Sequence, residues 1–141
     1  MKSRFWALVF ISLLEIAGLF CACGPATTTT LPASSLADTS WVLISYSPSA
    51  SQTTVPVHRT ITLNFRGLGG YDGSTGINNY GGALRFEGNQ LTIRGLTQTP
   101  DVDPVGNAYL ALLRQAETVE YQGERLIIQC RNGQALVFRP A

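Results

Sequence analysis

The fold is decided by the stretch at residues 73–84, GSTGINNYGGAL. Its first ten residues hold four glycines, which predicts positive φ angles or close backbone approaches where a Cβ would clash. The paired Asn78 and Asn79 tolerate left-handed conformations and can hydrogen-bond their own backbone. Tyr80 is expected to be the large anchor of the stretch, with a packed ring and a hydroxyl that finds a partner. The stretch therefore predicts a shaped turn and strand in a β fold, and it indicates no reaction.

Residues on both sides of this stretch follow the alternation of half-buried strands. In Thr60–Arg66 the alternation places three apolar side chains on an inner face, namely Ile61, Leu63 and Phe65. Asn132-Gly133 is typical of a two-residue hairpin turn, whereas residues 47–58 and 67–70 are expected to be loops. Further strands are predicted at residues 41–46, 83–86, 90–94, 118–121, 125–131 and 134–139.

One segment has the period of a helix instead. Apolar residues recur at helical spacing at Val105, Tyr109, Leu112, Leu113 and Ala116. Asp103 is placed to cap this helix, and Pro104 is suited to its first position. The fold class is therefore mainly β (α+β). We expect a small curled antiparallel sheet or cracked β-barrel of about seven or eight strands, with the helix covering its opening.

The chain begins with a segment typical of a secretory signal. Residues 1–4 are basic and residues 5–20 are mostly apolar, which is the pattern of a charged start followed by an apolar core. The apolar run is short for a membrane span, which needs about 20 residues. We therefore predict that residues 1–22 are a leader and not part of the folded domain.

The end of the leader is similar to a bacterial lipobox. Cys23 follows the small residue Ala22, whereas Cys21 follows the bulky Phe20. Cys23 is thus the predicted lipidation site, carrying fatty acids such as palmitate; a plain secreted protein and an uncleaved anchor are the alternatives. Gly24 is not the aspartate that retains lipoproteins at an inner membrane. The expected location is the outer membrane if the cell has two membranes, and otherwise the outer face of the plasma membrane.

The chain after the leader divides into a tether and one domain. Residues 23–35 are rich in threonine, proline and serine and are predicted to be a flexible tether, and residues 36–141 are the domain. Of the 10 basic residues Lys2 and Arg4 fall in the leader, and of the 9 acidic residues Glu15 does. The remaining charges balance, so nucleic acid is not an expected partner and any membrane attachment is covalent.

Candidate catalytic and metal-binding residues are sparse. His58 is the only histidine and is interpreted as a solvated loop residue rather than a general base. Ser74 lacks the context of a nucleophile elbow, and Asp72 has no glutamate partner that would close a calcium loop. Cys130 is interpreted as a small buried residue, with a redox or nucleophilic role as the alternative. We therefore predict no catalytic residues, no metal, no cofactor and no enzyme activity.

From Leu36 to Phe138 the chain resembles the META domain family, to which the heat-shock lipoprotein HslJ belongs. The first similarity is the segment from Leu36 through Trp41 to Tyr46. The central one is the family signature glycine–cysteine–asparagine–x–tyrosine–x–glycine, which corresponds here to Gly76, Asn78, Tyr80 and Gly82. Ile77 stands where the family commonly has cysteine, and no cysteine follows Thr99, so the disulfide of relatives has no counterpart.

The resemblance implies an exported, often lipidated, cracked barrel in a family associated with envelope stress. We expect a monomeric, non-enzymatic envelope protein that acts in stress resistance or assembly through an unknown protein partner. The alternative is a small carrier of a hydrophobic ligand or peptide, as in cracked-barrel secretion pilotins. Three residues would then line its groove: Tyr80, Tyr109 and Leu113. Packing of the same side chains in the core is the competing interpretation.

Overall fold

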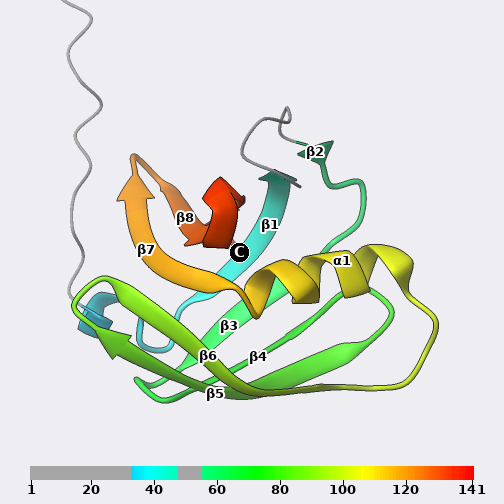
Figure 1. Ribbon diagram of the computed structural model, residues 1–141, viewed down its shortest axis with the longest axis horizontal. Coiled ribbons are helices and arrows are strands. Elements are labelled where there is room, and N and C mark those ends of the chain that lie inside the picture. The colour runs from blue at the N-terminus through cyan, green and yellow to red at the C-terminus, as the bar shows by residue number, and fades with distance from the viewer. Residues whose placement is uncertain (1–32, 48–54) are drawn as a thin grey trace, which may run out of the picture.

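The structure is a computed structural model that describes residues 33–47 and 55–141 (Figure 1). The predicted leader, Cys23 and the tether up to residue 32 lie outside the described residues, as does most of the loop expected at 47–58. The described chain forms one α-helix, two short 3-10 helices and nine strands. In chain order these are η1 (Ala33–Leu36), β1 (Ser40–Ser47), β2 (Val55–Pro56), β3 (Thr62–Arg66), β4 (Gly70–Ser74), β5 (Asn79–Glu87), β6 (Gln90–Gln98), α1 (Pro104–Leu113), β7 (Ala116–Gln122), β8 (Arg125–Cys130), η2 (Arg131–Gly133) and β9 (Ala135–Pro140).

Eight of these strands close into an antiparallel barrel. Neighbours pair in the order β1-β3-β4-β5-β6-β7-β8-β9, and β9 pairs back onto β1, with Leu43 opposite Phe138. The two-residue β2 is added beside β1, where Ser45 lies opposite Pro56. The predicted mainly β fold with a curled sheet and one helix is confirmed.

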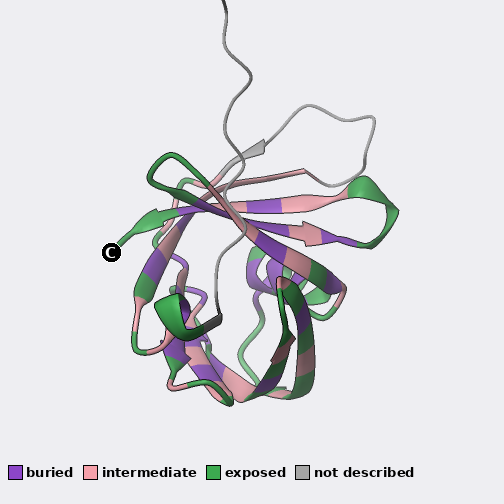
Figure 2. Cartoon of the chain, turned by 90° about the vertical axis from the view of Figure 1, so that its left-hand side faces the viewer, coloured by how far each residue is buried: buried purple, intermediate pink, exposed green. Residues whose placement is uncertain are grey.

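The barrel interior is filled by the apolar side chains that the alternation in the sequence predicts to face inward. Ile61, Leu63 and Phe65 are each at most 1% exposed, and buried positions alternate with more exposed ones along the strands (Figure 2). Hydrophobic burial of this kind supplies most of the driving force for folding. The largest fully buried side chains come from the strands, η1 and α1 alike: Tyr109, Phe65, Phe138, Leu36, Leu43, Ile61, Leu63, Leu91, Leu110, Leu113, Leu126 and Ile128.

The single α-helix starts as predicted and ends earlier. The Asp103 side chain accepts a hydrogen bond from the Gly106 amide at 2.9 Å, and Pro104 is in the first turn, so the predicted cap is confirmed. The helix stops at Leu113, and Ala116 begins β7 instead of ending the helix. In Figure 1 α1 lies alongside β6 and leads directly into β7.

The glycine-rich region is more strand and less turn than the sequence suggests. Residues 70–74 form β4, where the sequence predicted a loop up to residue 70, and β5 begins at Asn79, ahead of the strand predicted from Ala83. The turn between them is confined to residues 75–78. Within the stretch only Gly76 has a positive φ, at 87°, so neither asparagine adopts the left-handed conformation that it tolerates. By contrast, Asn132 and Gly133 have φ of 61° and 71°, as an Asn-Gly hairpin turn requires.

Candidate functional site

Two tyrosines and two glycines interlock across β4 and β5. Tyr71 lies opposite Gly82, and Gly73 lies opposite Tyr80. A Cβ on Gly73 would lie 2.6 Å from the Tyr80 hydroxyl oxygen, and one on Gly82 would lie 2.8 Å from the Tyr71 hydroxyl oxygen. Each tyrosine therefore fills the space that the opposite glycine leaves empty. These glycines are required by close approach and not by positive φ, because neither has one.

The interlock continues into a row of aromatic side chains. Ring centroids are 6.3 Å apart for Tyr71 and Tyr80, 5.7 Å for Tyr80 and Tyr109, and 6.4 Å for Tyr109 and Phe138. The Tyr80 hydroxyl donates to the Thr62 carbonyl oxygen, and its oxygen lies 2.6 Å from that of Tyr109. Burial raises the pKa of Tyr80 and of Tyr109 well above the usual value. Both hydroxyls are neutral near pH 7, so they serve packing and hydrogen bonding.

Tyr71 differs from Tyr80 because its buried hydroxyl has no hydrogen-bond partner among the described residues. Burial raises the pKa of Tyr71 to about 12, against a smaller opposing effect of the Arg114 charge. An unsatisfied buried hydroxyl costs about 1–3 kcal/mol in proteins. The Tyr71 hydroxyl therefore costs the interlock stability, whereas the Tyr80 hydroxyl is satisfied by hydrogen bonds.

Tyr71→Phe is expected to stabilise the domain by up to about 1 kcal/mol, because it removes an unpaired buried hydroxyl and keeps the ring. The matched variant Tyr80→Phe is expected to cost about 1–2 kcal/mol, because it leaves the Thr62 carbonyl and the Tyr109 hydroxyl without that partner. Urea unfolding of both variants measures the difference. Equal destabilisation by the two changes would show that the Tyr71 hydroxyl is not orphaned.

A buried carboxylate joins the β4–β5 turn to the start of the helix. Asp103 is fully buried and pairs with Arg59 at 2.8 Å. It also accepts hydrogen bonds from the Thr75 hydroxyl and the Gly106 amide. Burial by itself raises the pKa of the Asp103 carboxyl, but the hydrogen bonds from Thr75, Gly106 and Arg59 outweigh burial, so the pKa is lowered. The carboxylate is thus held charged inside the fold.

Asn78 joins the same turn to the loop after β6. Its side-chain oxygen accepts from the Thr99 hydroxyl at 2.7 Å and from the Asp101 amide at 3.1 Å, and its side-chain nitrogen donates to the Asp101 carbonyl at 2.9 Å. Asn78 itself is fully buried. The asparagine therefore ties two segments that are adjacent in space but distant in sequence, instead of bonding its own backbone.

The residues considered for catalysis are not brought together. Asp72 is paired with Arg66 and Asn64 on the outer face, and the Ser74 hydroxyl oxygen accepts from the Gly76 amide. His58 is exposed. Cys130 is buried, as its strand parity predicted, and burial raises the pKa of its thiol to about 12, so it is a poor nucleophile. Among the described residues no three histidine, cysteine or acidic side chains are grouped for a metal.

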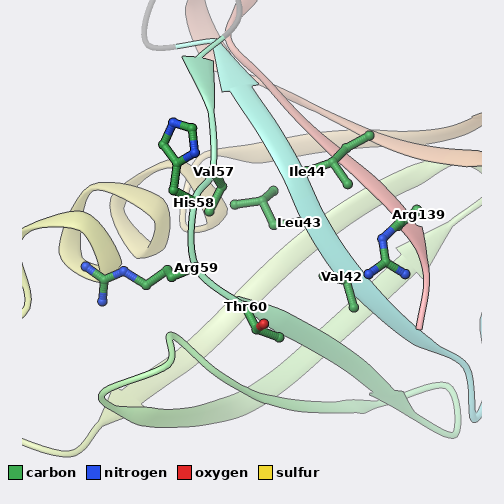
Figure 3. A pocket seen from close by; sticks show the side chains of 8 residues that line it. All are labelled: Val42, Leu43, Ile44, Val57, His58, Arg59, Thr60 and Arg139. Atoms are coloured by element: carbon green, nitrogen blue, oxygen red, sulfur yellow. The ribbon is translucent and has the colours of Figure 1, made fainter.

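One cavity lies between β1 and residues 57–60 (Figure 3). Its volume is about 330 Å³, and its lining includes His58, Arg59 and Arg139. Figure 3 shows that the Arg59 side chain extends away from Arg139, which lies on the other side of β1. The Arg59 guanidinium also forms an ion pair with Asp103. The cationic groups do not converge, so the cavity has no built anion site.

The residues expected to line a ligand groove are core residues. Tyr109 is 1% exposed and Leu113 is fully buried. Tyr80 contributes to a shallow cavity of about 340 Å³ with Thr97 and Gln98, but its own side chain is 5% exposed. A ligand beside the helix would have to displace these side chains. Trp41, the first motif residue, packs against Tyr121 with ring centroids 5.5 Å apart.

Another cavity opens between β6 and β7. Its volume is about 480 Å³, and it is lined by residues of both strands together with Arg114 and Arg131. The two strands are paired at one position, Gln90 opposite Thr118. The sequence predicted a cracked barrel with the helix over its opening, but not that the opening would lie between β6 and β7.

The family model of the META domain matches residues 34–141. The chain belongs to the META domain family. The match begins within η1 and covers all of the barrel strands and the helix. Among curated proteins none matches the sequence. Within the described part of this META domain protein, no helix has both the length and the apolarity needed to cross a membrane.

Two solved structures resemble this META domain in fold. One is the NMR structure of a protein from Burkholderia xenovorans, with 23% identity and a TM-score of 0.66, covering 84% of this chain and 97% of that one. The other is the crystal structure of a DUF4847 family protein from Bacteroides vulgatus ATCC 8482, with 15% identity and a TM-score of 0.60, covering 74% and 93%. At these identities the likeness shows the fold alone.

Each META signature residue has a defined place in the fold. Gly76 adopts the positive φ of the turn, Asn78 ties the turn to the loop after β6, and Tyr80 and Gly82 belong to the interlock. Ile77, at the position where relatives commonly have cysteine, is 51% exposed. The hydrogen bonds of Asn78 with Thr99 and with the main chain of Asp101 join the segments that follow Gly76 and Gln98. The close approach at Gly73 was predicted, but its partner Tyr80 was not, although the repeated Tyr-x-Gly at 71–73 and 80–82 is a visible signal. The roles of Thr75 and Arg59 as partners of Asp103 were also not predicted.

Proposed function

We propose that this META domain protein is a non-enzymatic, lipid-anchored protein of the cell envelope that acts through a protein partner in stress resistance or assembly. The observation that carries the proposal is the position of Cys23. It follows Ala22 at the end of an apolar leader, and the META domain starts eleven residues later, at residue 34. A short tether between a lipidated cysteine and a folded domain places that domain at the membrane surface.

The site chemistry supports a binding role over an enzymatic one. The signature positions are occupied here by residues that pack or hydrogen-bond inside the fold. The buried titratable groups have pKa values displaced away from neutrality, namely upward for Tyr80 and Cys130 and downward for Asp103. General acid–base catalysis works best with a pKa near the operating pH. The carrier alternative receives less support, because aromatic side chains fill the interior beside α1.

Cys23→Ser is expected to abolish fatty-acid labelling and release the protein from membranes, because the lipidated thiol is the proposed anchor. The measurement is metabolic labelling with a clickable palmitate analogue, followed by membrane fractionation. Cys21→Ser is the matched control and is expected to keep both label and membrane attachment. A Cys23→Ser protein that stays labelled would contradict the proposal, and one that stays membrane-bound without label would indicate an uncleaved leader.

A further inference from the structure

The barrel has a seam between β6 and β7. Elsewhere around this part of the barrel, neighbouring strands are paired along most of their length, as β5 and β6 are from Glu87 opposite Gln90 to Tyr80 opposite Gln98. Between β6 and β7 the pairing stops after Gln90 opposite Thr118, although β6 continues to Gln98. The open part of β6 is therefore a strand edge within an otherwise closed barrel.

The connection between the two strands explains the seam. The pairs β5–β6 and β7–β8 are joined by tight turns, whereas β6 and β7 are joined by a loop and α1. Figure 1 shows β7 starting at the C-terminal end of α1 and curving away from β6 beyond that point. With Gln90 opposite Thr118, the antiparallel register places Thr92 opposite Ala116, the first residue of β7. The rest of β6 therefore extends past the start of β7 and has no β7 residue opposite it.

The seam contains a cavity that is bordered by two arginines and by Glu117. Its cavity of about 480 Å³ is lined by Leu91 and Ile93 on the β6 side, and by Arg114 and Arg131 near the helix end. The Arg114 side chain forms no hydrogen bond or ion pair with any described residue. Arg131 is held only by Glu117 at 3.7 Å, a weak exposed pair. An incoming carboxylate would therefore reach Arg114 directly and would compete with Glu117 for Arg131.

We propose that the β6–β7 seam is a docking site for an extended, acidic peptide segment of the protein partner. The peptide backbone would add to the open edge of β6 at residues 92–95, in the manner of β-strand addition. Its acidic side chains would pair with Arg114 and Arg131, and alternate apolar side chains would lie over Ile93. This inference rests on the proposed function only in assuming that the domain acts through a protein partner.

A second copy of the same chain is the less favourable occupant. A two-fold contact brings the same surface of both copies together, so Arg114 and Arg131 of one copy would face those of the other. Like charges at such a contact are unfavourable. Thr92, Arg94 and Gly95 on β6 are exposed, and Arg94 would add to the repulsion. The arginines of the seam therefore favour an acidic partner over a second copy of the chain.

The test is a selection of short random linear peptides on the full-length protein in nonionic detergent. The display library is first depleted on the Arg114→Glu/Arg131→Glu double variant and then selected on the wild type. Enriched peptides are synthesised and their affinities measured by fluorescence anisotropy. Arg125→Glu is the matched control, because Arg125 is an exposed arginine on β8 outside the seam. Arg114→Gln checks that effects come from lost charge and not from a carboxylate at the helix end.

The expected result is a set of acidic peptides whose affinity falls about tenfold with each seam arginine removed and is unchanged in Arg125→Glu. N-methylation of alternate amides gives a second readout: strand addition tolerates one alternate set and is abolished by the other, since only one set faces β6. The idea is overturned if no peptide is enriched, if the seam variants bind equally well, or if both methylated sets bind alike.

A protein that elutes as a dimer, with β6 amides protected from hydrogen exchange in the dimer alone, would also overturn the proposal and assign the seam to a second copy. None of these outcomes depends on lipidation at Cys23. If the peptides bind but Cys23→Ser keeps its fatty acid, the anchoring proposal fails while the docking site stands. If the labelling behaves as expected but no peptide binds, the docking site fails while the anchoring proposal stands.

Discussion

Gly73→Ala is expected to cost the domain about 4 kcal/mol of unfolding free energy, or to prevent folding. A Cβ at this position would lie 2.0 Å from the Thr62 carbonyl oxygen as well as against the Tyr80 hydroxyl. The Thr62 oxygen is main chain of β3 and accepts the Tyr80 hydrogen bond, so it cannot move aside without disturbing three paired strands. The strain comes from close packing, since the φ of Gly73 is not in the left-handed region.

Gly69→Ala is the control for this prediction. A Cβ on Gly69 meets no atom within 4 Å, and its φ is not positive either, so a change within about 0.5 kcal/mol is expected. The measurement is urea unfolding of the protein without its leader, followed by the fluorescence of Trp41, which is buried against Tyr121. Similar midpoints for Gly73→Ala and wild type would contradict the interlock described for β4 and β5.

Asp103→Ala is expected to destabilise the domain by about 4 kcal/mol, the range for removing one partner of a buried ion pair. The change leaves Arg59 without its anion, the Thr75 hydroxyl without its acceptor, and the helix without its cap. Asp101→Ala is the matched control, because the Asp101 side chain is exposed and its interactions with Asn78 are made by the main chain. Equal losses of unfolding free energy in the two variants would show that the buried interactions of Asp103 do not stabilise the domain.

The contribution of the Asp103–Arg59 pair to folding stability depends on pH in a defined direction. Because the folded-state pKa of Asp103 is lowered, its contribution is fully present above the unfolded pKa of about 3.9. That contribution is lost as the pH falls through the folded value. The stability advantage of wild type over Asp103→Asn should therefore be constant near neutrality and shrink below about pH 4. The pKa of Asp72 is also lowered, by its Arg66 partner, but this pair is exposed and contributes little.

Patterns that depend on near neighbours in the chain were predictable from the sequence. Alternation around Leu63 fixed the inner face of β3, and the helical period with Asp103 and Pro104 located α1. Asn132-Gly133 marked the last hairpin. The parity of Cys130 with Ile128 placed its thiol in the core. Each of these depends on local geometry that one segment determines by itself.

Features that depend on two distant segments were not predictable. Gly70–Ser74 looks like a turn because its glycines have no side chains. It becomes strand β4 because Tyr80 of β5 fills the space at Gly73, while Tyr71 of β4 fills the space at Gly82 of β5. Asp103 looked like a cap and is also the partner of Arg59, which lies 44 residues earlier. The seam depends on where β7 starts relative to β6, which neither strand determines by itself.

The pairing of β1 with β9 joins nearly the first and last residues of the domain, as Trp41 opposite Pro140 shows. Barrel closure must therefore wait until the final strand is available, and the entropy of closing so long a loop is lost before its contacts form. Slow folding of this kind would keep a nascent chain open for longer, which is compatible with the export that we propose for this protein. Removal of the last six residues would leave β1 and β8 with bare edges and is expected to yield an aggregation-prone chain instead of a smaller barrel.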